Sequence, residues 1–144
     1  MIMKSKRKHL RSLLRIYILG IIIKNEKVHG YSIYKELLER IDESIYKKTG
    51  TPSIGTIYRI LKELVEEGLV TKEERTKNGR KIIYYAPTKK GIEEFLSISK
   101  MFITKVIMGL SLVIDVVKTL DKKGYDIVDI FYDIKKINQI TSNI

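Results

Sequence analysis

The charged residues between positions 51 and 68 follow an order that would suit the binding of an anion. The basic side chains of Arg59 and Lys62 come first, and acids crowd the second half of the stretch. These acids are Glu63, Glu66 and Glu67. In a helix this order opposes the dipole, at a cost of a few tenths to about 1 kcal/mol for each exposed charge. It leaves a positive helix end free for phosphate, although an ordinary amphipathic helix with arbitrary surface charges is the alternative.

A single helix over residues 51–68 would position these charges. Ser53 can cap the first backbone N–H groups with its hydroxyl, and Gly68 suits the left-handed residue that ends many helices. Apolar residues recur every three or four positions and predict one buried face. They are Ile54, Ile57, Leu61, Leu64 and Val65.

Catalytic chemistry has little support in the sequence. The chain has two His, no Cys and no phosphate-binding glycine loop, so the common metal, nucleophile and nucleotide sites lack their residues. His29 could be a ligand or a base, but beside a turn we expect it to make local hydrogen bonds or packing contacts. We therefore expect no enzyme activity, no metal and no cofactor.

The positive charge is unevenly distributed along the 144 residues. The formal net charge is +11, and residues 1–91 hold 21 Lys and Arg against 10 Asp and Glu, whereas residues 92–144 hold 7 of each. This division predicts a polyanion-binding domain over residues 1–91 and an element for self-association over residues 92–144. A basic surface that is merely solvated is the alternative. We expect a cytoplasmic location by default.

Two further helices are predicted before residue 51. A basic leader and an apolar run over residues 16–23 superficially resemble a secretory signal, but the cleavage pattern is missing and the apolar spacing is helical. We expect the first helix over Leu10–Lys24 and the second from Tyr31 to near Asp42. A polar connector over residues 43–52, with Lys47 and Lys48, then leads to the helix described above, in helix-turn-helix order.

The residues after Gly68 alternate with the period of strands. Residues 69–75 and 80–86 flank Asn78-Gly79, the strongest short hairpin signal. A two-residue turn would place Lys77 opposite Arg80, and like charges facing each other destabilise a hairpin. Arg75 and Lys81 add to the positive tip. An anionic partner would relieve this repulsion, and three helices followed by a basic hairpin form a winged helix.

Five segments in this order resemble the PadR family of transcriptional regulators. They are Ile18-Leu19-Gly20, His29-Gly30-Tyr31, Ser53 through Tyr58, Glu67 through Val70, and Tyr84-Tyr85 with Thr88 and Gly91. The resemblance implies a winged-helix repressor that dimerises through C-terminal helices and is often released from its operator by a small molecule. One departure is Ile54, where the family usually has Pro. The family's effector pocket is rich in aromatic residues and this chain has no Trp, so the resemblance names no effector.

A heptad pattern continues from Thr88 to Leu120 and predicts a long helix that a partner must cover. A membrane span is the competing interpretation, but Lys105 and Asp115 interrupt the necessary apolar length. Gly124 should end this helix, and an apolar segment after Asp126 should fold back against it. The residues predicted to form the dimer interface are Leu96, Ile103, Val106, Leu110, Val113, Val117 and Leu120.

The fold expected is mainly α with a small β-hairpin, a winged helix-turn-helix domain followed by C-terminal dimerisation helices. We expect a homodimeric repressor that binds double-stranded DNA at a near-palindromic operator. Thr56 and Arg59 are the candidates for base contacts. The candidates for phosphate contacts are Ser53, Tyr58, Lys62, Arg75, Lys77, Arg80 and Lys81, with Tyr58 alternatively a core residue. A protein-interaction adaptor that binds an acidic partner is the second hypothesis.

Overall fold

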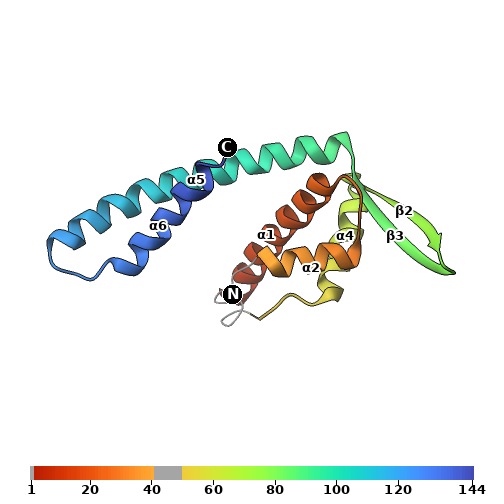
Figure 1. The fold of residues 1–144 in the computed structure, drawn as a ribbon, viewed down its shortest axis with the longest axis horizontal. Helices are drawn as coiled ribbons and strands as arrows, with labels where there is room; N and C mark the ends of the chain where they lie inside the picture. The colour runs from red at the N-terminus through yellow and green to blue at the C-terminus, as the bar shows by residue number, and fades with distance from the viewer. Residues whose placement is uncertain (1, 41–49) are drawn as a thin grey trace. The chain divides into compact units, whose positions relative to one another are not determined.

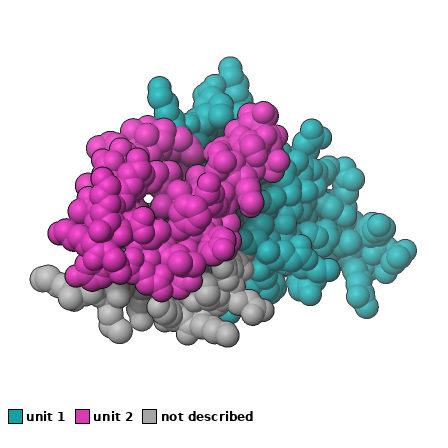
Figure 2. Space-filling view, turned by 60° about the vertical axis from the view of Figure 1, so that its left-hand side comes forward, with its two compact units in different colours: residues 1–100 teal, residues 101–144 magenta. Residues whose placement is uncertain are grey.

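A computed structural model describes residues 2–40 and 50–144, with side chains in the first helix from Leu13 onward (Figure 1). The chain divides into two compact units, residues 1–100 and residues 101–144, which Figure 2 colours separately. The elements are, in order, α1 (Ile2–Asn25), β1 (Val28–His29), α2 (Gly30–Arg40), α4 (Ile54–Glu66), β2 (Val70–Lys77), β3 (Arg80–Pro87), α5 (Lys89–Lys122) and α6 (Val128–Thr141). The fold is therefore mostly helical with one small sheet, as expected.

The helices differ from the sequence-based expectations mainly at their ends. α1 begins at Ile2 rather than Leu10, because the helix continues into the basic leader. α4 is shorter than residues 51–68: Ser53 is its N-cap, with the side-chain oxygen accepting from the Thr56 N–H at 3.2 Å, and Gly68 has a φ of +74°. The predicted end of the second helix at Asp42 and most of the connector, including Lys47 and Lys48, lie outside the described residues.

The core of the first unit lies where α1, α2 and α4 meet the sheet. All its fully buried large side chains are aliphatic, and they follow the helical spacing that the sequence showed. They are Ile18, Ile22, Ile33, Leu37, Ile57, Ile60, Leu61 and Leu64. Ile60 was not predicted, and Ile54, predicted on the apolar face, is 40% exposed at the start of α4. The buried face of α4 thus fixes which of its residues are left for another molecule.

The predicted hairpin is present, but it belongs to a three-stranded antiparallel sheet in the order β1-β3-β2. Asn78 and Gly79 have φ values of +53° and +76°, as a two-residue turn of the predicted type requires, and Lys77 pairs with Arg80. β1, which pairs Val28 with Tyr85 and His29 with Tyr84, was not predicted. Two residues are too few to show alternation, so only the contact with β3 defines this strand.

His29 has the local role expected of it. It directly precedes α2, and its Nδ1 lies 3.3 Å from the Ser32 backbone nitrogen, which donates to it. The ring also meets Tyr84 edge to face, with centroids 6.0 Å apart. His29 therefore joins the start of α2 to the sheet.

The start of α5 is held by hydrogen bonds to backbone carbonyls of the residues between α4 and β2. The Thr88 hydroxyl donates to the Gly68 carbonyl at 2.7 Å, and the Thr88 N–H donates to the Leu69 carbonyl at 3.1 Å. Thr88 also caps α5, because its Oγ1 accepts from the Gly91 N–H at 3.0 Å. A Cβ on Gly91 would lie 2.0 Å from the Leu69 carbonyl oxygen. This contact, which we call the Gly91 junction, needs a residue without a side chain.

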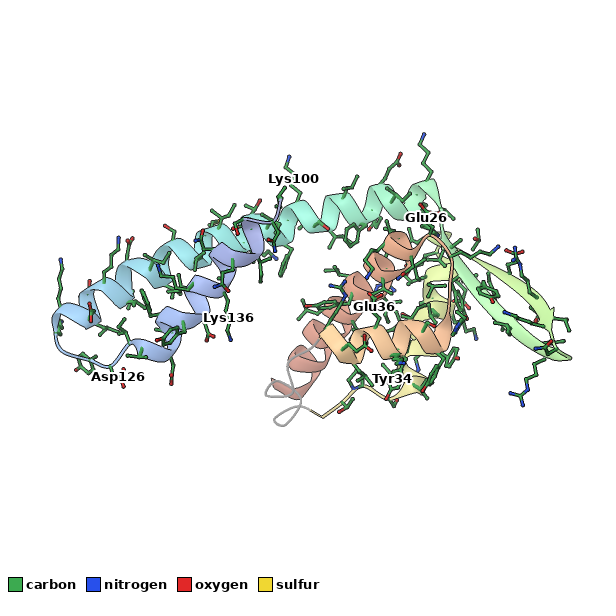
Figure 3. All side chains as sticks on the ribbon, viewed as in Figure 1. Glu26, Tyr34, Glu36, Lys100, Asp126 and Lys136 are labelled. Carbon is green, nitrogen blue, oxygen red and sulfur yellow. The ribbon has the colours of Figure 1, made fainter. Side chains whose placement is uncertain are left out.

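The second unit consists of the C-terminal part of α5 and the whole of α6. After a turn, α6 runs back beside α5 (Figure 1). Gly124 turns the chain with a φ of +88°, and Asp126, labelled in Figure 3, accepts from the Val128 N–H at 3.0 Å. Every residue of this unit is at least partly exposed. Across the segments that the structure describes, no helix has the length and apolar character needed to cross a membrane.

The Gly91 junction can be tested by stability. Gly91→Ala should lower the free energy of unfolding by about 1–3 kcal/mol or more, because the new methyl group meets a backbone carbonyl that cannot move alone. Gly55→Ala is the matched control, since Gly55 also lies in the first turn of a helix and its nearest neighbour would be an ordinary 3.7 Å away. Urea unfolding should show Gly91→Ala clearly weakened and Gly55→Ala unchanged or slightly strengthened. Equal stabilities would contradict this account of Gly91.

Candidate nucleic-acid interface

The outer face of α4 presents its two basic side chains to solvent. Arg59 and Lys62 are exposed, whereas Ile57, Ile60 and Leu61 are buried in the core. Within the described part of the chain, neither cation has an ion-pair partner. Both are therefore available to an external anion.

The hydroxyls at the start of α4 are used within the cap. Ser53 Oγ lies 3.0 Å from Thr56 Oγ1 and accepts from the Thr56 N–H. Thr56 is half-buried, and Ser53 is exposed. A nucleic acid contacting either hydroxyl would meet a group that is already held in place, which favours a fixed contact geometry over a mobile one.

The acids at the other end of α4 hold the helix against α1. Arg15 Nη1 lies 3.3 Å from Glu63 Oε2, and Arg15 Nη2 pairs with Glu67. The unfavourable placement of these acids relative to the helix dipole is therefore at least partly offset by a tertiary ion pair. This pairing explains the acidic half of α4 without an anion, so the argument for an anion rests on the exposed cations.

Tyr58 combines packing with exposure. A Cβ on Gly30 would lie 2.7 Å from Cε1 of Tyr58, so the ring lies against the start of α2 where only glycine fits. The side chain is nevertheless 44% exposed. Burial raises the pKa of the neighbouring Tyr85, and Tyr58 adds to that shift. The two interpretations of Tyr58, packing residue and phosphate contact, are therefore compatible.

The strand register divides the predicted wing cations between two faces. Paired residues of an antiparallel ladder lie on the same face, and neighbours along a strand alternate. Arg75, Lys77 and Arg80 consequently share the face of Tyr84, whereas Lys81, which pairs with Thr76, shares the face of the buried Tyr85. Figure 3 shows side chains on both sides of the hairpin. We call the face of Arg75, Lys77 and Arg80 the basic wing face.

Arg75 differs from the two cations at the tip of the hairpin. Its Nε donates to Glu73 Oε1 at 3.0 Å, and its guanidinium carbon lies 5.7 Å from the centroid of the Tyr84 ring. In the part of the chain that the structure covers, Lys77 and Arg80 have no acidic partner. The sequence predicted a phosphate contact for each of these three residues. The structure separates them into one paired cation, Arg75, and two free cations.

A model of the PadR-like family of transcriptional regulators matches residues 18–97, more than half of the chain. The chain belongs to the PadR family. This membership makes it a winged-helix, DNA-binding transcriptional regulator, in agreement with the exposed cations of α4 and the wing. A comparison with curated proteins finds no match.

Solved structures of PadR-family regulators resemble the chain over most of their length. One is a PadR-like regulator from Bacillus cereus ATCC 14579, at 27% identity and a TM-score of 0.58, with 74% of this chain and 96% of that chain covered. Another, from Clostridium difficile R20291, has 27% identity and a TM-score of 0.51, with coverages of 67% and 96%. A PadR-family regulator from Eggerthella lenta DSM 2243 has 19% identity and a TM-score of 0.59, with coverages of 78% and 92%, and shows the fold alone.

Several residues that shape this PadR-type surface escaped the sequence-based prediction. Arg15 positions α4, and Lys27, Glu73 and Tyr84 form a cluster at the base of the wing. Strand alternation alone could have put Glu73 on the basic wing face, but Lys27 reaches it from the turn before β1. Over the described residues, no group of three or more His, Asp or Glu side chains could hold a metal ion.

The two free cations of the basic wing face should bind phosphates. Lys77→Ala with Arg80→Ala should weaken binding to all duplexes alike and make the logarithmic salt slope shallower by up to about 2 units for each bound protomer, one for each lost contact. Lys35→Ala with Lys123→Ala removes the same charge at exposed positions that are not part of the hairpin and serves as the control. Fluorescence anisotropy at several salt concentrations measures both. A loss of sequence discrimination at an unchanged slope would mean that the wing reads bases.

Proposed function

We propose that this PadR-family protein is a repressor that acts in the cytoplasm as a homodimer on a near-palindromic operator. The observation that carries the proposal is the contrast between the two units. The first exposes free cations on α4 and the wing, and the second exposes apolar side chains with no buried residue of its own. The first suits a polyanion, and the second suits a second copy of the chain.

In this proposal α4 is the recognition helix that enters the major groove. Thr56 and Arg59 lie in its first two turns, the part of such a helix that reaches base edges. Arginine can contact guanine with two hydrogen bonds, whereas a lysine farther along the helix suits phosphate. The remaining contacts, all to phosphate, are assigned to Ser53, Tyr58, Lys62, Lys77, Arg80 and Lys81. Arg75 would add a phosphate contact only after leaving Glu73.

The assignment of Arg59 to bases and Lys62 to phosphate predicts two different losses. Arg59→Ala should reduce discrimination between the operator and a random duplex by about 1–3 kcal/mol. Lys62→Ala should weaken both duplexes equally and reduce the salt slope by about 1 for each bound protomer. Both residues are exposed on the same helix, so each variant is the other's control.

Footprinting on the promoter of the protein's own gene and its neighbours would supply the operator for this comparison. Anisotropy titrations of the wild type and both variants then give the two quantities. Wild-type binding weaker than about 100 μM at physiological salt would fall below typical non-specific binders and overturn the proposed function.

The apolar surface proposed for dimerisation runs along α5 and α6. Soluble monomers rarely expose large contiguous apolar patches. On α5, Ile103 is 52% and Val113 is 38% exposed, and other large apolar side chains beside them are open to solvent. These are Met101, Phe102, Val106, Ile107, Met108, Leu112 and Val116. Leu110, Val117 and Leu120 of the predicted interface are half-buried within the chain, so the exposed members would form most of the contact.

Two-fold symmetry of such a dimer would set the operator. Two copies of α4 would read half-sites separated by one turn of the duplex or a multiple, about 10–10.5 bp from centre to centre for each turn.

The division at residues 91 and 92 between DNA binding and dimerisation is part of this proposal. Because Phe95 of α5 packs on Gly20 of α1, the first turns of α5 also support the DNA-binding domain.

Charged substitutions within the predicted interface should separate the subunits. Ile103→Glu with Val113→Glu should give a monomer, because burying two carboxylates without partners is costly. Lys118→Glu changes the net charge by the same amount at an exposed position outside the heptad seam and should remain dimeric. Sedimentation velocity measures the state of each protein. A double variant that stays dimeric would place the interface elsewhere.

A further inference from the structure

Four residues meet at the base of the wing, on the basic wing face. Lys27 comes from the turn between α1 and β1, Glu73 and Arg75 come from β2, and Tyr84 comes from β3. Glu73 accepts from Arg75 Nε at 3.0 Å through Oε1 and pairs with Lys27 through Oε2. We call these four residues the wing-root cluster.

The ring of Tyr84 supports both cations of the cluster. The guanidinium carbon of Arg75 lies 5.7 Å and the ammonium of Lys27 lies 6.0 Å from the ring centroid, within the range of cation–π attraction. Tyr84 is in turn paired with Glu73 across the strands. One carboxylate and one aromatic ring therefore hold two cations that belong to different elements.

Glu73 is charged at neutral pH and reachable from solvent. Hydrogen bonds from Lys27 and from Arg75 lower the pKa of its carboxyl, which keeps the ionised form. Its side chain is 49% exposed, so a phosphate approaching the wing would compete with it for both cations. Lys77 and Arg80 lie on the same face of the hairpin. Among the residues that the structure describes, no acidic side chain competes with phosphate for either of them.

We propose that Glu73 is a positioning residue that limits sequence-independent DNA binding by holding Lys27 and Arg75 at Tyr84. Phosphate affinity is largely independent of sequence and grows with each cation that can reach the backbone. A cation held by a carboxylate must give up that bond before it binds a phosphate, whereas a free cation need not. This inference rests on the proposed binding to duplex DNA. It adds a residue, Glu73, that weakens that binding.

Glu74 provides a control with the same charge and the opposite orientation. It follows Glu73 on β2, pairs with Ile83 on the other face of the hairpin, and has no ion-pair partner within the described segments. Glu73→Gln and Glu74→Gln each remove one negative charge from neighbouring exposed positions. An effect of net charge alone would appear in both variants, and an effect of the wing-root cluster would appear only in the first.

The test is a salt series of anisotropy titrations with a fluorescein-labelled duplex of random sequence. Glu73→Gln should bind more tightly than the wild type at low salt, with a slope steeper by up to about 2 units for each bound protomer, one for each released cation. Between 50 and 200 mM salt its affinity should therefore fall by about tenfold more than that of the wild type for each bound protomer. Adding Lys27→Ala should remove about half of the extra slope, which a purely structural role for Glu73 would not do.

The outcomes separate this inference from the proposed function. A wild type that does not bind the duplex would overturn both. A wild type that binds, with Glu73→Gln matching Glu74→Gln in slope and affinity, would overturn the role of Glu73 alone. Circular dichroism shows whether each variant is folded. The Lys27→Ala single variant is a second test. Its salt slope should match that of the wild type, because Glu73 already restrains that lysine. A shallower slope in that variant would also overturn the role of Glu73.

Discussion

The Gly91 junction is the constraint on which the rest of the DNA-binding unit depends. At this point the residues between α4 and β2 meet the residues between β3 and α5 through backbone groups and the Thr88 hydroxyl, and the missing side chain of Gly91 allows the contact with the Leu69 carbonyl. Backbone atoms cannot repack as side chains do, so this contact holds the start of α5 against the residues that join α4 to the wing. Both DNA-binding elements of the PadR fold are thus fixed at one place.

Ion pairs then decide which cations on this rigid frame are free. Arg15 engages the acids at the C-terminal end of α4, and Glu73 engages Lys27 and Arg75 at the base of the wing. Arg59, Lys62, Lys77 and Arg80 are left without acidic partners among the described residues. Exposed ion pairs add little to stability. Their larger effect here is to sort the cations into those that hold the structure and those that can meet phosphate.

Glycines explain much of the resemblance between this chain and the PadR family. Gly20 lies under the ring of Phe95, Gly30 lies under Tyr58, and Gly91 lies on the Leu69 carbonyl. These residues stand within the segments that carry the resemblance in the sequence, and each permits a close approach between elements. Part of the resemblance therefore rests on residues that hold the fold, whereas the resembling segment from Ser53 through Tyr58 also contains Thr56, one of the two residues proposed to read bases.

The sequence by itself determined the features that depend on near neighbours. The core positions Ile57, Leu61 and Leu64, the cap by Ser53 and the turn at Asn78-Gly79 follow from spacing and backbone preference, and most of the fold could be predicted from them. Only the tertiary structure decided which predicted site residues act alike. Strand pairing put Lys81 on the face opposite Arg75, Lys77 and Arg80, and the distant Lys27 reached Glu73 through the short strand β1. Such contacts join residues far apart in the chain, and no local period records them.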